Sequence, residues 1–169
     1  MLVLDTLVVE RLLQVLDEEA RLYEDILKIS KNKTDVIVKG NVAELENIVK
    51  IEQSIVLRIN ELEDMRDEVV GKLSAEVGLK PSEVSISSLL GHLKGEQAEK
   101  LKCFQERMMA ILGELKNINE LNAKLINNSL EYINFSINLL AAADAADGTY
   151  GSSGQINSSG KRSFIDMKL

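Results

Sequence analysis

Residues 8–38 read VVERLLQVLDEEARLYEDILKISKNKTDVIV, and apolar residues recur in and around this segment every seven positions. The main row consists of Met1, Val8, Val15, Leu22, Ile29 and Val36. A companion row contains Leu12 and Ile26 but is interrupted by Glu19 and Lys33. A seven-residue spacing is typical of helices that pack side by side. The pattern predicts one long helix over about residues 3–38, with an apolar face wide enough for two neighbours.

The pattern stops at Gly40 and Asn41 and then starts again. Glycine often follows a helix end, and asparagine can cap the next helix. The second main row consists of Ile48, Ile55, Leu62 and Val69, and a flanking row consists of Val42, Val49, Val56, Val70 and Val77. We therefore expect a second helix over 41–77, antiparallel to the first because the connection is short.

Residues 79–95 contain Gly, Pro and Ser and are predicted to be a connector with a short helix at 85–92. A third helix is expected over 96–146, because apolar residues again recur every seven positions from Phe104 to Leu139. The predicted fold is an all-α, long antiparallel three-helix bundle of coiled-coil type over residues 1–146. Residues 147–169 are rich in Gly and Ser and are predicted to form a flexible tail.

The third predicted helix is longer than the other two. At 1.5 Å per residue it spans about 75 Å against about 55 Å, so it should extend beyond the bundle by about 10 to 15 residues. Apolar residues continue there, namely Ile133, Phe135, Ile137, Leu139 and Leu140. An exposed apolar surface of this kind usually binds a partner. The alternatives are that the connector, the tail or a second copy of the chain covers it.

Charge and composition exclude several classes of function. The net charge of −7 and pI near 4.9 argue against binding to nucleic acid or to an anionic membrane surface. Residues 1–5 lack the basic region and long apolar run of a signal peptide, so we expect none, and no apolar run is long enough to cross a bilayer. Its one cysteine, Cys103, cannot form an intramolecular disulfide. We expect a cytoplasmic protein without membrane insertion.

The residues that enzymes use are scarce in this sequence. His92 is the only histidine and Cys103 has no histidine near it in sequence, so we read both as ordinary packing or surface residues. No glycine-rich phosphate loop is present. The acidic clusters, including Asp17 to Glu19, alternate with basic residues and are read as solvated helix faces. We predict no enzyme activity, no cofactor and no metal.

Two segments near the C-terminus resemble the FlgN family of flagellar type III export chaperones. The first is the asparagine-rich run NINELNAKLINNSLEYI at 117–133, and the second is TYGSSGQ at 149–155. The resemblance implies a cytosolic chaperone with a long antiparallel helical bundle. Such a protein binds the C-terminal helices of hook–filament junction proteins, prevents their premature assembly and delivers them to the export gate. The family associates client binding with its C-terminal region.

Together, the resemblance and the predicted exposed helix end give a set of candidate client-binding residues. A client helix is expected to pack against apolar residues, while a polar row limits packing of this helix end on its own bundle. The apolar residues are Leu125, Tyr132, Ile133, Phe135, Leu139 and Leu140, and the polar row is Asn122, Ser129 and Ser136. Tyr150 is a candidate contact for the export gate. The competing hypothesis is a structural coiled-coil protein that scaffolds a partner or forms a homodimer through the same helix end.

Overall fold

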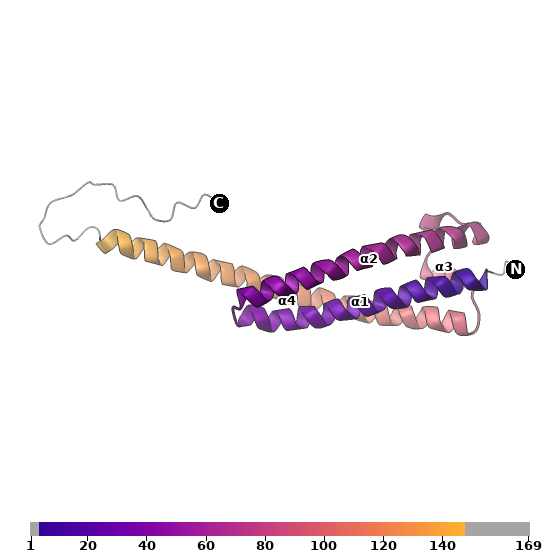
Figure 1. Ribbon diagram of the computed structural model, residues 1–169, viewed down its shortest axis with the longest axis horizontal. Helices are drawn as coiled ribbons and strands as arrows, with labels where there is room; N and C mark the ends of the chain where they lie inside the picture. The colour runs from indigo at the N-terminus through magenta and orange to yellow at the C-terminus, as the bar shows by residue number, and fades with distance from the viewer. Residues whose placement is uncertain (1–3, 148–169) are drawn as a thin grey trace, which may run out of the picture. The chain divides into compact units, whose positions relative to one another are not determined.

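A computed structural model describes residues 4–147 of the chain (Figure 1). The elements are α1 (Thr6–Val38), α2 (Val42–Val77), the 3-10 helix η1 (Pro81–Glu83), α3 (Ile86–Leu90) and α4 (Glu96–Asp147). Over the described residues all elements are helical, which confirms the all-α prediction. The predicted flexible tail, apart from Asp147, lies outside the described residues.

The chain forms two compact units, Met1–Ile126 and Asn127–Leu169. Helices α1, α2 and α3 belong to the first unit, whereas the division between the units falls inside α4. The N-terminal part of α4 therefore belongs to the first unit, and its C-terminal part belongs to the second unit.

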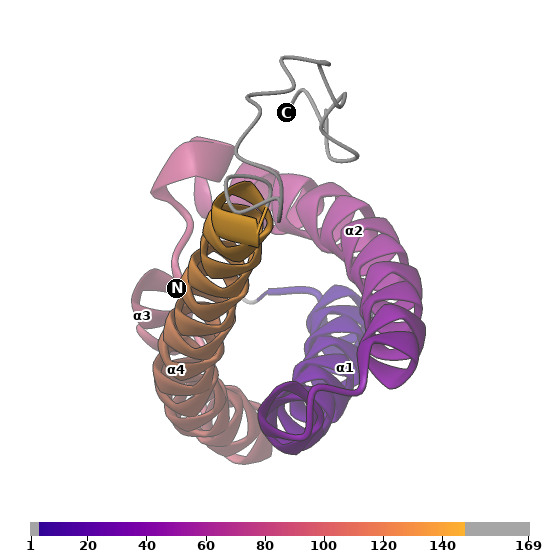
Figure 2. The ribbon, with the colours of Figure 1, turned by 90° about the vertical axis from the view of Figure 1, so that its left-hand side faces the viewer.

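Helices α1 and α2 form an antiparallel hairpin, seen from its loop end in Figure 2. Gly40 has φ of 66° in this loop, a left-handed conformation that glycine adopts without steric cost. Asn41 then caps α2, because its side-chain oxygen accepts a hydrogen bond from the Glu44 amide at 3.2 Å. Gly78, with φ of 71°, ends α2 in the same left-handed conformation.

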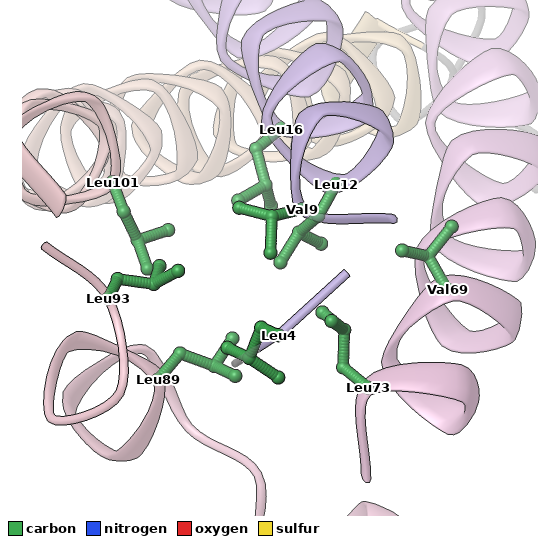
Figure 3. Packing of buried hydrophobic residues seen from close by; sticks show 9 residues of the cluster. All are labelled: Leu4, Val9, Leu12, Leu16, Val69, Leu73, Leu89, Leu93 and Leu101. Atoms are coloured by element: carbon green, nitrogen blue, oxygen red, sulfur yellow. The ribbon is translucent and has the colours of Figure 1, made fainter. Parts of the chain in front are cut away.

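The main core lies where α1, α2, the connector and the start of α4 meet. Figure 3 shows its side chains directed toward one another from all four segments. The buried members are Leu4, Val9, Leu12, Leu16, Val69, Leu73, Leu89, Leu93 and Leu101. A smaller cluster of Leu27, Ile111 and Leu115 packs α1 on α4 farther along. Helix α1 thus uses its wide apolar face to contact both long neighbours.

Polar contacts reinforce both sides of α1. On the α4 side, Arg107 donates to Glu24 at 2.6 Å and to Asp17 at 2.9 Å. These two carboxylates raise the pKa of Arg107 above its ordinary value, chiefly through the hydrogen bond to Glu24. On the α2 side, Lys33 pairs with Glu52 at 2.7 Å.

Glu19 corrects one expectation from the sequence. Instead of lying on a solvated helix face, its side chain is 1% exposed, and both of its carboxylate oxygens accept hydrogen bonds from Arg66 on α2. Burial raises the pKa of Glu19, and the Arg66 charge partly opposes this effect. Glu19, which interrupts the companion row of apolar residues in α1, therefore forms an ion pair with Arg66 of α2.

Candidate partner-binding site

The second unit exposes apolar side chains along α4. Within residues 127–146 no side chain is buried. The large apolar residues there are between 41% and 72% exposed: Leu130, Tyr132, Ile133, Phe135, Ile137, Leu139 and Leu140. Phe135, Leu139 and Leu140, which the length of the helix predicts to be accessible, are exposed in the structure. An apolar surface of this density is typical of an interaction site.

Helical spacing arranges these residues in two ridges. Tyr132, Phe135 and Leu139 follow one another at intervals of three and four, and so do Leu130, Ile133, Ile137 and Leu140. We call these sets the tyrosine ridge and the isoleucine ridge. On the opposite side of the helix stand the polar residues Asn127, Glu131, Asn134 and Asn138. The second unit therefore presents an amphipathic helix.

A row of small hydroxyl side chains runs between the two ridges. Ser129 and Ser136 occupy helical positions between Tyr132 on one side and Ile133 on the other. The Ser136 hydroxyl donates to the Tyr132 carbonyl at 2.9 Å, so its hydrogen-bonding need is met within the helix. A partner that covers the small Ser136 side chain therefore leaves no hydroxyl donor of this residue unpaired.

Asn122 differs from the expectation. It lies in the first unit and is 3% exposed. Its amide nitrogen donates to the Ser30 carbonyl at 2.9 Å, and its amide oxygen accepts from the Thr34 hydroxyl at 2.6 Å. The residue therefore fastens α4 to α1, because a buried amide needs both of its polar atoms paired. Its predicted role of keeping α4 off the bundle does not fit these contacts.

Two of the remaining predicted residues, Leu125 and Tyr150, are not part of the exposed ridges. Leu125 lies in the first unit and is half-buried. Tyr150 lies outside the described residues. Sequence reasoning left Leu130 and Ile137 out of the predicted site, although their spacing from Ile133 places them on the same ridge.

The described residues show no constellation for metal or nucleophilic chemistry. Residues 4–147 contain no group of three His, Cys, Asp or Glu side chains placed to hold a metal ion. The His92 ring nitrogen Nδ1 lies 2.9 Å from the Ser88 carbonyl, and Cys103 is an exposed free thiol. Within this same part of the chain, no helix is long and apolar enough to cross a membrane.

Comparison with known proteins identifies the family of the chain. Residues 1–158 match the family described as FlgN protein. The chain belongs to the FlgN family. This confirms the resemblance seen in the sequence, and the family consists of flagellar export chaperones rather than enzymes. A protein from Bacillus subtilis strain 168, "Uncharacterized protein YvyG", is 32% identical to the chain over 119 residues, which cover 70% of this chain and 72% of that protein. No solved structure matches the chain.

Proposed function

We propose that this FlgN-family protein acts in the cytosol on hook–filament junction proteins. It binds their C-terminal helices, prevents premature assembly and delivers them to the flagellar type III export gate. The observation that carries the proposal is the pair of exposed apolar ridges on residues 127–146. An amphipathic client helix can lay its apolar stripe along these ridges, as helices do in other helix-in-groove complexes.

The chemistry of the ridges favours binding that can be reversed. Each Leu or Phe side chain that becomes fully buried stabilises the complex by about 1.5–3 kcal/mol. Ordering of both partners offsets much of this gain. Ser129 and Ser136 add little apolar area in the centre of the surface. A client held in this way is protected from assembly but can still be released at the gate.

The test replaces the centre of the tyrosine ridge with charge. In Phe135→Asp combined with Leu139→Asp, a client helix has to bury two carboxylates or leave the ridge, so the affinity for a purified junction protein should fall at least about a hundredfold. Calorimetric titration measures this change. Both side chains are exposed, so the helical circular dichroism of the variant should equal that of the wild type.

The control is Met109→Asp, which places one aspartate on an exposed apolar position of α4 in the first unit. It should leave the affinity for the junction protein unchanged. Equal affinities for the wild type and the Phe135 and Leu139 variant contradict the proposed site.

A second copy of the chain is the other candidate occupant, as in a structural coiled-coil protein. The same exposed ridges favour this alternative, because they are apolar enough to pair with themselves. Sedimentation of the purified chain separates the two functions. A tight dimer that the Phe135 and Leu139 variant dissociates, with no binding of the junction protein, supports self-association.

We also propose that Tyr150 contacts the export gate. The variant Tyr150→Ala should retain client affinity but reduce export of the junction protein. Normal export by this variant contradicts the role of Tyr150.

A further inference from the structure

The first unit contains an apolar groove that its own helices leave open. Its walls are formed by residues of α1, α2, α4 and the connector. The cavity has a volume of about 410 Å³, and its lining includes Leu16, Tyr23, Val70, Ile86, Phe104 and Leu112. We call it the first-unit groove. Because it lies wholly within residues 1–126, it is distinct from the two ridges.

One wall of the groove continues along α2 as a row of valines that Glu63 interrupts. Val42, Val49 and Val56 are exposed and stand in the same seven-residue row as Val70, which lines the cavity. Residues with this spacing share one helix face. A straight row of this kind fits a helix laid parallel to α2 better than a small molecule, which fills only a compact pocket.

The charge on the α2 wall is negative. Asp67 lines the cavity, and Glu63 stands one helical turn away from it. Among the described residues neither carboxylate has an ion-pair partner, whereas Glu19 is paired with Arg66. The groove therefore combines an apolar lining with two carboxylates that a cationic side chain can pair with.

We propose that the first-unit groove binds a basic amphipathic helix of another protein. The apolar stripe of that helix packs between α2 and α4, and a Lys or Arg beside the stripe pairs with Asp67 and Glu63. The helix completes a four-helix arrangement in which the valine row of α2 becomes buried. This interaction does not require residues 127–146, so it stands or falls independently of the proposed client site.

The probe is a synthetic helical peptide of about 18 residues, which spans about 27 Å. It carries leucines at positions i, i+3, i+4 and i+7 with lysines beside them, and a twin peptide carries glutamates in place of the lysines. With the full-length chain, the lysine peptide should shift the methyl resonances of Val70 and Leu112 and bind more tightly than its twin.

Two substitutions locate the interaction. Asp67→Lys should weaken binding of the lysine peptide about tenfold and strengthen binding of the glutamate twin, because a close attraction becomes a repulsion. The matched control Glu106→Lys makes the same change of charge at an exposed position of α4 that is not part of the groove lining. It should leave the affinity within about twofold, as expected for screened charges at a distance.

Three results overturn the proposal. Equal effects of Asp67→Lys and Glu106→Lys mean that only the net charge attracts the peptide. Groove methyl shifts that appear without peptide when residues 148–169 are deleted mean that the chain's own C-terminal segment occupies the groove. Shifts that depend on protein concentration mean that a second copy does.

Discussion

Helix α4 contributes leucines to both units, but the burial of these leucines differs between the units. Leu101 is completely buried in the first unit, whereas Leu139 is 60% exposed in the second. Both residues belong to apolar rows on the same helix. Apolar spacing thus defines a helix face in both units, but burial requires other segments to cover that face, as α1 and the connector do around Leu101.

The largest expected difference between the units is in packing energy. Leu101→Ala removes a fully buried side chain and should lower the free energy of unfolding by about 2–5 kcal/mol. Leu139→Ala should change it by no more than about 0.5 kcal/mol, as at other exposed positions. Denaturant unfolding followed by far-UV circular dichroism measures both values. A comparable loss from Leu139→Ala breaks the comparison, because it means that Leu139 is buried in solution.

A smaller difference is expected between asparagines of the two units. Asn122→Ala removes the two hydrogen bonds that join α4 to the Ser30 carbonyl and the Thr34 hydroxyl, which should cost about 1–3 kcal/mol. Asn134→Ala, at an exposed position of the second unit, should be neutral or slightly stabilising because alanine favours helices. The same unfolding experiment compares the two variants, and equal stabilities refute a structural role for Asn122.

The smallest expected effect concerns the buried carboxylate of the first unit. The pKa of Glu19 is raised from its ordinary value of 4.5, chiefly by burial, so the folded chain holds this proton more tightly than the unfolded chain does. Stability from this group is therefore present below pH 4.5 and is lost as the pH rises through the raised pKa. The glutamine of Glu19→Gln does not titrate, so the variant lacks this pH-dependent contribution to stability.

Unfolding experiments across the acid range give the free energy of unfolding of the wild type and of Glu19→Gln, and the second value is subtracted from the first. This difference should fall as the pH rises, and Glu106→Gln, which removes an exposed carboxylate, serves as the control. A difference that grows with pH shows that Arg66 outweighs burial.

The long helices and the exposed helix end could be predicted because they depend on local spacing. Seven-residue rows predict α1, α2 and α4, and the excess length of the third helix predicts that Phe135 and Leu139 are exposed. The roles of Glu19 and Asn122 could not be predicted in this way. Each is a polar residue in an apolar row, and only a residue distant in sequence, Arg66 for one and Ser30 for the other, shows that the position is buried and paired.

The first-unit groove also escaped prediction, for a different reason. Sequence rows indicate which faces of α2 and α4 are apolar, but not how closely the two helices approach each other. The groove is lined by residues of α1, α2, the connector and α4, so it depends on how all four segments pack. The distance between α2 and α4 depends on how whole helices pack, and no single stretch of residues specifies it.

The two ridges repeat themselves after one heptad. Tyr132 and Leu139, Leu130 and Ile137, Ile133 and Leu140, and Ser129 and Ser136 are all seven residues apart. A bound helix that slips by about 10 Å meets an equivalent set of side chains. Only Phe135 interrupts this degeneracy, since Asn128 and Ala142 stand one heptad away from it. For a partner helix bound as proposed, the surface therefore offers two alignments one heptad apart, and the Phe135 side chain favours one of them.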